Sequence, residues 1–236
     1  MKVRLLVLAI SLAPGVFFAG AQTVSSADPF PFKEGTYWVY QGLVRYNEAG
    51  TENGAEAKVN WRMEIVRVLR RDDAQAAIVK GFPGDLNWSN GSAAPSESMV
   101  VRTNDGKVYL IEEGRAAAAE QKFSDTHAAL KDFLKDDDLW FALPLAVGKK
   151  FCGEDGANRD DEMYCLVVEA PDQESFNGIK GLPAKLPAAY SLVYRTNPDD
   201  TETELVPGIG IVRYEYHHHG TVADTELKLI EFHAGP

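Results

Sequence analysis

The stretch from Pro207 to Phe232 reads PGIGIVRYEYHHHGTVADTELKLIEF and carries the clearest structural pattern in the chain. Apolar and polar residues alternate along Ile209–His218 and again along Asp224–Phe232, which is the pattern of β-strands that bury one face. Gly220 lies between the two runs and is typical of a turn. The stretch therefore predicts a β-hairpin, entered through glycines, that closes an antiparallel sheet.

The same alternation recurs along most of the chain and is punctuated by turn residues. The Asn104-Asp105-Gly106 tripeptide is the strongest of these turn signals. Further strands are predicted at residues 36–46, 57–69, 76–82, 99–103, 107–113, 163–168, 189–196 and 202–206. The phase of the second strand slips near Ile65-Val66, which indicates a β-bulge. Gly42 interrupts the first strand and indicates a bend or a bulge.

One segment departs from the β pattern. Phe123, Leu130 and Leu134 recur at helical spacing, and the polar residue Ser124 stands where a helix N-cap would stand. We therefore predict a single helix from Ser124 to Lys135. The predicted fold class is mainly β (α+β), a curved antiparallel sheet or half-open β-barrel with one packed helix.

The first 21 residues have the pattern of a signal peptide. Lys2 and Arg4 precede an apolar run, and the small residues Ala19-Gly20-Ala21 follow it. Removal of residues 1–21 takes away two positive charges and moves the formal net charge from −11 to −13. We expect cleavage near Ala21, a leader over residues 22–34 and a single β-rich domain over residues 35–236.

The net charge and the cysteine content of the chain indicate its location and its partners. An acidic protein repels phosphate backbones and anionic lipid surfaces, so we expect no nucleic acid partner and no stable membrane anchor. Cys152 and Cys165 are the two cysteines of the chain. In an exported chain such a pair indicates a disulfide. We therefore expect a soluble periplasmic or extracellular protein.

Two halves of the chain share short similarities. Gly35-Thr36-Tyr37-Trp38 resembles Gly148-Lys149-Lys150-Phe151, and Gly106-Lys107-Val108-Tyr109 resembles the segment Gly210–Tyr214. An internal repeat of residues 35–113 and 148–232 is one hypothesis that follows from them.

The histidines of the closing stretch raise the question of a metal. On a strand His217 and His219 point to one side and His218 to the other. The pair His217 and His219 has chelating geometry, although Zn²⁺ usually takes three or four protein ligands. The alternative interpretation is a polar strand end beside the turn at Gly220.

Four aromatic residues are candidates for ligand contact. Trp38, Tyr40, Trp61 and Tyr214 lie on predicted strands. Such residues usually fill a sheet core, but they would line a cavity if the sheet curved around one. The sequence contains no phosphate-binding loop, dinucleotide fingerprint or hydrolase elbow, and we expect no cofactor and no enzymatic activity.

The segments Phe30–Tyr40 (FPFKEGTYWVY), Leu143–Phe151 (LPLAVGKKF) and Pro207–Tyr216 (PGIGIVRYEY) resemble those of a group of uncharacterised exported bacterial β-rich proteins. The predicted fold of that group is similar to the half-open β-barrel of Lol-type lipoprotein carriers. The resemblance implies a curved sheet around a hydrophobic groove that a helix partly covers. It transfers no catalytic residue.

Three functions follow as expectations. The first is a non-catalytic exported protein that binds or carries an apolar ligand such as a lipid. The second is an envelope assembly or protein-interaction factor without a small ligand. The third is a metal-binding protein or enzyme that uses His217 and His219.

Overall fold

The closing hairpin forms as the alternation predicts. In the computed structural model, β11 (Gly210–His218) pairs antiparallel with β12 (Ala223–His233), and the turn between them contains Gly220. The structure describes residues 28–48, 53–153, 155–171, 176, 179–183 and 186–236. The expected signal peptide of residues 1–21 lies outside the described residues.

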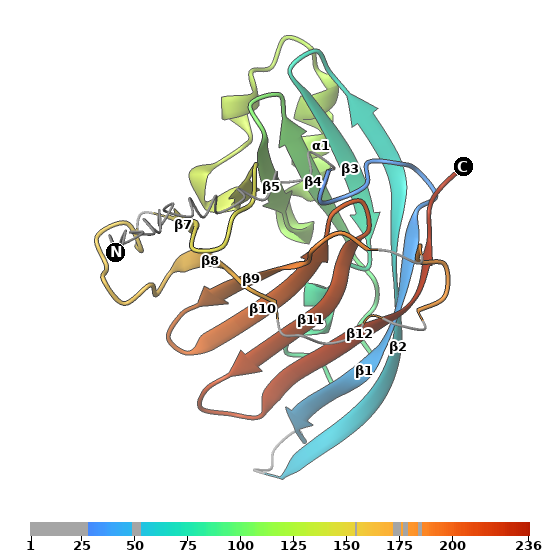
Figure 1. Ribbon diagram of the computed structural model, residues 1–236, viewed down its shortest axis with the longest axis vertical. Coiled ribbons are helices and arrows are strands. Elements are labelled where there is room, and N and C mark those ends of the chain that lie inside the picture. Colours follow the sequence, from blue (N-terminus) through green and yellow to red (C-terminus); the bar gives the residue numbers. More distant parts are fainter. Residues whose placement is uncertain (1–27, 49–52, 154, 172–175, 177–178, 184–185) are drawn as a thin grey trace, which may run out of the picture.

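The described residues form a 12-stranded antiparallel sheet (Figure 1). The other strands are β1 (Tyr37–Asn47), β2 (Gly54–Arg70), β3 (Ala74–Lys80), β4 (Glu97–Thr103), β5 (Lys107–Ile111), β6 (Leu139–Ala142), β7 (Lys150–Cys152), β8 (Cys165–Glu169), β9 (Tyr190–Arg195) and β10 (Asp199–Val206). The helices are α1 (Glu113–Ser124) and the short 3-10 helices η1 (Pro83–Leu86), η2 (Leu130–Asp132) and η3 (Asp136–Asp138).

Apart from β6 and β7, consecutive strands of the chain pair with one another, and β1 also pairs with β12. The β1–β12 pairing, hereafter the closed seam, joins the two halves of the chain through long strands. At the other junction β6 and β7 are the two ends of the sheet, with no ladder between them among the described residues. This junction is hereafter the open seam. The sheet is a nearly closed barrel, and the predicted half-open barrel is confirmed.

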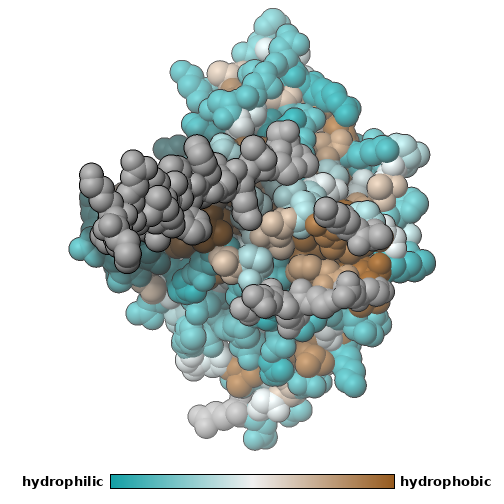
Figure 2. All heavy atoms as spheres, in the orientation of Figure 1, coloured by the Kyte–Doolittle hydropathy of each residue, from teal (hydrophilic) through white to brown (hydrophobic). Residues whose placement is uncertain are grey.

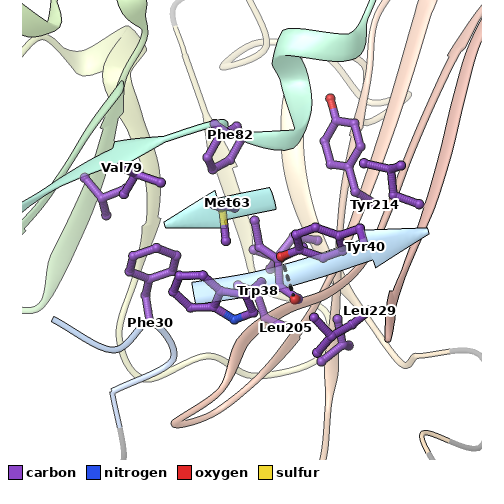
Figure 3. Packing of buried hydrophobic residues seen from close by; sticks show 14 of the residues in the cluster. Phe30, Trp38, Tyr40, Met63, Val79, Phe82, Leu205, Tyr214 and Leu229 are labelled. Carbon is purple, nitrogen blue, oxygen red and sulfur yellow. Dashed lines mark hydrogen bonds between the residues drawn. The ribbon is translucent and has the colours of Figure 1, made fainter. Parts of the chain in front are cut away.

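Large side chains fill the barrel interior beside the closed seam. Trp38, Tyr40 and Met63 are completely buried there, and Phe30 stacks on Trp38 with the ring centroids 5.4 Å apart (Figure 3). The interior consists of alternate residues of the strands because side chains on a strand point to opposite faces in turn. Phe30 belongs to the segment that the sequence predicts as a leader, and it is part of this core.

Two local irregularities of the sheet were predicted from the sequence. The register of β2 against β3 shifts between Ile65 and Arg67, so the predicted bulge near Ile65-Val66 is confirmed. The register shift of β1 lies between Val39 and Tyr40 instead of at Gly42. At Gly42 a Cβ atom would collide with the main-chain carbonyl of Glu226 on β12. Glycine therefore permits close contact across the closed seam.

The predicted helix from Ser124 to Lys135 is wrong in its position. The helix α1 ends at Ser124, and the following residues form turns and η2. The reason is the alanine-rich sequence Glu113–Ser124, which has a higher helix propensity than the segment after it. Leu130 and Leu134, which have helical spacing to Phe123 in the sequence, lie in η2 and just after it and pack against the same cluster as Phe123. Phe133 also folds back onto Phe123, with the ring centroids 6.2 Å apart.

The helix α1 packs on the outside of the barrel. Its buried residues Ala116, Ala119 and Phe123 meet the outward residues of β3 and β4, among them Ile78 and Met99. The groove cover that the resemblance implies is therefore not formed by the body of α1, because this helix occupies the opposite face of the sheet. None of the helices in the described residues combines the length and the hydrophobicity that a membrane span requires.

The two halves of the chain each contribute six consecutive strands, β1–β6 and β7–β12. The internal repeat of residues 35–113 and 148–232, like the domain boundaries, stays a prediction.

Candidate ligand-binding cleft

A cleft of about 920 Å³ lies at the open seam. It is bordered by β5 and β6 on one side and by β7 to β10 on the other. Its apolar and aromatic lining consists of Phe82, Leu110, Leu139, Trp140, Phe151, Tyr164, Leu166, Leu192, Tyr194 and Tyr214. A volume of this size suits one small organic molecule.

The strand register builds the wall of the cleft on the β7 side. Phe151 on β7 pairs with Leu166 on β8, and Leu166 pairs with Tyr194 on β9. Tyr194 then pairs with Thr201 on β10. Residues that are directly opposite one another in a sheet share a face, so these side chains form one continuous row across four strands. The row ends at the open seam because β7 has no further neighbour.

A loop folded into the barrel forms the floor of the cleft. The segment after β3 contains η1 and brings Phe82, Gly84 and Asn87 to the cleft. The Nδ2 atom of Asn87 donates a hydrogen bond of 2.7 Å to the hydroxyl of Tyr214 on β11. This bond ties the loop to the opposite wall. Burial raises the pKa of Tyr214 far above the ordinary value of tyrosine, so the hydroxyl stays protonated.

Two buried hydroxyl groups remain open to a ligand. Ser98 on β4 and Thr203 on β10 line the cleft, and each residue is only 4% exposed. Neither hydroxyl makes a side-chain hydrogen bond with another of the described residues. Each hydroxyl can both donate and accept a hydrogen bond, so both can bond to a molecule in the cleft.

Negative charge dominates the rim. Within the described residues seven carboxylates line the cleft, and Arg115 is its only cationic residue. The carboxylates are Asp85, Glu112, Glu113, Asp136, Asp137, Asp138 and Asp155. Two of the seven have local partners: Asp85 accepts hydrogen bonds from the backbone and side chain of Ser96, and Asp138 binds Arg115.

The Arg115–Asp138 pair anchors one side of the rim. The guanidinium of Arg115 makes two contacts with the carboxylate of Asp138, one of them 2.9 Å long, and also donates to the carbonyl oxygen of Phe133 at 3.1 Å. Asp138 also accepts the backbone N–H of Lys135. The carboxylate of Asp138 raises the pKa of Arg115 by hydrogen bonding, so the guanidinium remains charged. This network fixes η3 beside the start of α1.

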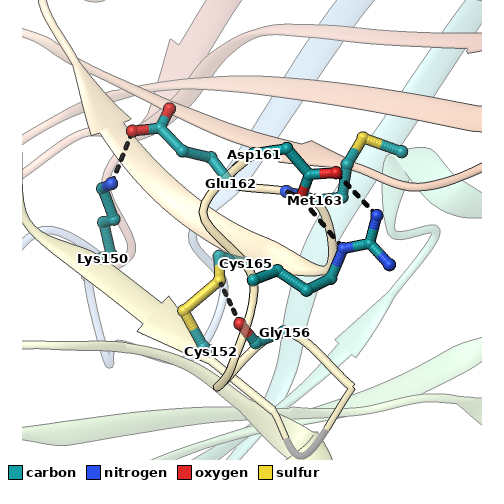
Figure 4. Close-up of a disulfide and its surroundings, with 8 residues drawn as sticks. Lys150, Cys152, Gly156, Asp161, Glu162, Met163 and Cys165 are labelled. Atoms are coloured by element: carbon teal, nitrogen blue, oxygen red, sulfur yellow. Dashed lines mark hydrogen bonds and ion pairs between the residues drawn. A yellow bond between two sulfur atoms is a disulfide. The ribbon is translucent and has the colours of Figure 1, made fainter.

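The predicted disulfide forms at the other side of the rim. Cys152 on β7 is bonded to Cys165 on β8, and the two residues are direct partners in the ladder (Figure 4). The strand β7 has only three residues, so the covalent bond holds a short end strand in place. Cys152 itself borders the cleft.

The four predicted ligand contacts lie in different places. Trp38 and Tyr40 are fully buried beside the closed seam, and Trp61 is buried as well. The polar atoms of these three donate to backbone carbonyls of Ile209, Ile211 and Gly81, as expected of core aromatics. Tyr214 is the one residue of the four that lines the cleft. The ligand-binding role of the four residues stays a prediction.

The histidines do not converge on a shared site. His217 lies 3.4 Å from Asp224 on β12, and His219 lies 3.1 Å from Asp200 on β10. The part of the chain that the structure describes holds no group of three or more His, Cys, Asp or Glu side chains placed to bind a metal.

His218 points to the opposite side of β11 from its two neighbours. Its Nδ1 lies 2.8 Å from Asp199, and its ring contacts Trp88 at a centroid distance of 4.3 Å. The opposite orientation of His218 follows from the alternation of side chains along a strand.

Sequence reasoning missed most of the cleft. Its lining comes from both halves of the chain, for example Leu110 on β5 and Tyr194 on β9. The alternation indicates which residues of a strand face the interior. No local pattern shows that β6 and β7 stay apart. Of the cleft residues, sequence reasoning singled out Tyr214 as a ligand contact and Cys152 as a disulfide partner. The acidic triplet Asp136-Asp137-Asp138 is a further local signal that could have pointed to this site.

Neither a protein-family model nor a curated protein matches the chain. Two solved structures are similar to it at 14% sequence identity, and each alignment covers 88% of this chain and 99% of the other. One is a proposed lipoprotein from Parabacteroides distasonis, with a TM-score of 0.38. The other is a proposed exported protein with a YmcC-like fold from Bacteroides fragilis, with a TM-score of 0.40. A likeness of this degree says nothing about what this chain binds.

Proposed function

We propose that this chain is an exported, non-catalytic binding protein that takes a small molecule with an apolar body into the cleft at the open seam. The observation that carries the proposal is the cleft itself, about 920 Å³ of space at the open seam of the barrel. Its floor and walls combine apolar and aromatic side chains with polar ones, and two hydroxyls without a side-chain partner can orient a ligand. Ligand sites commonly combine these features.

Export is part of the same proposal and rests on two features of the sequence. The signal-peptide pattern of residues 1–21 directs a chain out of the cytoplasm. The Cys152–Cys165 disulfide suits an oxidising compartment. The expectations of no nucleic acid partner and no membrane anchor rest on the acidic charge. Figure 2 shows hydrophilic residues over much of one face and hydrophobic residues gathered across its middle.

The non-catalytic role is supported by the chemistry of the lining. Cys152 is bonded to Cys165, and the guanidinium of Arg115 is bonded to Asp138. Among the described residues that line the cleft, no serine or threonine hydroxyl is hydrogen-bonded to a histidine or carboxylate that would activate it as a nucleophile. A binding role needs no such pair.

The test is uptake of an environment-sensitive probe by the purified full-length mature protein. We expect 1-anilinonaphthalene or a similar uncharged fluorophore with an apolar body to bind with one site per chain. Thr201→Trp should abolish binding, because Thr201 lies in the wall and the larger side chain would fill the cleft. Gln41→Trp is the matched control, because Gln41 is exposed on β1 away from the cleft.

Equal binding by both variants would place the probe elsewhere and overturn the proposal. Native mass spectrometry of the protein as purified gives an independent measurement, because a retained ligand would add mass to the wild type and not to Thr201→Trp.

A second candidate is an envelope interaction factor without a small ligand. One observation favours it: the barrel beside the closed seam is filled by residues such as Trp38 and Tyr40. A protein that binds no probe and carries no co-purified molecule would favour this second candidate.

A further inference from the structure

We propose that the ligand of the cleft is an organic cation, a molecule with an apolar body and an ammonium or amidinium group. This inference rests on the proposed function, because it concerns the charge of a ligand in the same cleft. It goes beyond an apolar ligand such as a lipid, since many lipids are neutral or anionic.

The rim of the cleft carries an excess of negative charge. Five of the seven lining carboxylates make no ion pair or side-chain hydrogen bond with another described residue. They are Glu112, Glu113, Asp136, Asp137 and Asp155. An anionic head group would meet repulsion from all five, whereas a cation would be attracted to them.

These carboxylates lie on both sides of the open seam. Asp136 and Asp137 belong to η3 on the β6 side, and Asp155 belongs to the loop after β7. A Cβ atom on Gly153 would lie 3.5 Å from Oδ1 of Asp137, so the β6 side reaches across to the β7 side at this point. The negative charge therefore surrounds the entrance.

Behind the rim, aromatic rings line the interior of the cleft. Burial raises the pKa of Tyr194, and the charges of Asp155 and Asp137 add to this effect, which places both carboxylates near the aromatic wall. Trp140, Phe151 and Tyr194 present rings to the cleft. Aromatic faces attract organic cations, and this attraction grows when water is excluded.

Two residues that line the cleft carry hydroxyl groups. Ser98 and Thr203 are 4% exposed, and their oxygens can accept hydrogen bonds from ligand N–H groups. A ligand with several N–H donors would satisfy both these hydroxyls and the carboxylates at the rim. Carboxylates, hydroxyls and aromatic faces together suit a cation with an apolar body better than a neutral or anionic one.

The experiment compares three naphthalene probes of equal size: 2-naphthylmethylammonium, 2-naphthylmethanol and 2-naphthoate. Binding to the full-length mature protein is followed by titration calorimetry at low and high salt. We expect the ammonium probe to bind at least about ten-fold more tightly than the alcohol, and the carboxylate most weakly. The advantage of the ammonium probe should shrink at high salt because salt screens exposed charges.

Two variants test the residues. Asp136→Asn combined with Asp137→Asn should weaken binding of the ammonium probe about ten-fold and leave binding of the alcohol unchanged. Glu34→Gln combined with Asp72→Asn removes the same charge from exposed positions outside the cleft and is the matched control. Asp155→Asn tests the β7 side of the rim separately. All five positions are exposed, so circular dichroism should show native folding.

The outcomes separate the two proposals. Equal affinity for the ammonium and alcohol probes, or preference for the carboxylate, overturns the cation inference and leaves the proposed binding function intact. Loss of the ammonium preference in the control variant as well as in the cleft variant also overturns it, because the preference would then come from net charge. Failure of all three probes to bind overturns both proposals.

Discussion

The closed seam and the open seam are the two places where the first and second halves of this chain meet. They differ in the length of their strands, in the pairing between those strands and in the size of the side chains behind them. At the closed seam β1 and β12 each have 11 residues and pair along most of their length. At the open seam β6 has four residues and β7 has three, and the lysine Lys149 bridges the gap through bonds to two backbone carbonyls.

The side chains behind the two seams differ in the same way. Behind the closed seam Trp38 and Tyr40 fill the interior and bond to the backbone of β11 and the turn before it. Behind the open seam the small residues Ser98, Thr201 and Thr203 leave space. Strand length and side-chain volume together decide where a barrel is packed and where it can receive a ligand.

The largest expected effect is a difference in stability between substitutions of Trp38, behind the closed seam, and Trp140, at the open seam. Trp38→Ala should destabilise the fold by about 3–5 kcal/mol, because it removes a fully buried ring and leaves a closed cavity. Trp140→Ala should cost about half as much, because its ring borders the cleft and water can enter the space. Urea denaturation of both variants measures the difference. A cost for Trp140→Ala as large as that for Trp38→Ala would show that the open seam is packed as tightly as the closed seam.

The next effect concerns the covalent bond at the open seam. Cys152→Ala combined with Cys165→Ala should lower the free energy of unfolding by about 3 kcal/mol, because the bond closes a loop over a sequence separation of 13 residues. Hydrogen exchange should increase most in β7 and β8 and remain slow in β1 and β12. Uniform acceleration across the sheet would instead mean that the disulfide stabilises the whole barrel.

The smallest effect is a pH dependence on the tyrosines. Burial raises the pKa of Tyr40 and of Tyr214, so each stabilises the fold fully below the ordinary tyrosine pKa of about 10 and loses that contribution as the pH rises toward its folded value. The free energy of unfolding should therefore decline above about pH 10, and less steeply in Tyr40→Phe and Tyr214→Phe.

At neutral pH the same two variants should each cost about 1 kcal/mol through the lost hydrogen bond to Ile211 or Asn87. Denaturation curves between pH 7 and 11 measure both quantities. An identical alkaline slope in wild type and variants would show that other groups cause the decline.

The errors of sequence interpretation have a common physical cause. The ten predicted strands and the bulge near Ile65-Val66 follow from alternation along the chain, and the Cys152–Cys165 bond follows from the presence of two cysteines in an exported chain; the structure confirms them. The short strands β6 and β7 were not predicted. The helix was displaced because Leu130 and Leu134 have helical spacing to Phe123 in the sequence, whereas they return to the cluster of Phe123 from η2 and the residues after it. A spacing pattern does not distinguish a residue within a helix from a residue that returns to it.

The sequence by itself determined the alternation that makes each strand two-faced, the turns that reverse the chain and the acidic charge. These properties are local or additive, so they can be read from neighbouring residues or from composition. Only the tertiary structure decided that Trp38, Tyr40 and Trp61 lie outside the cleft while Tyr214 borders it, and that carboxylates of η3 and the disulfide loop face one opening. The reason is that the cleft exists where two distant strands fail to pair, which depends on the curvature of the whole barrel.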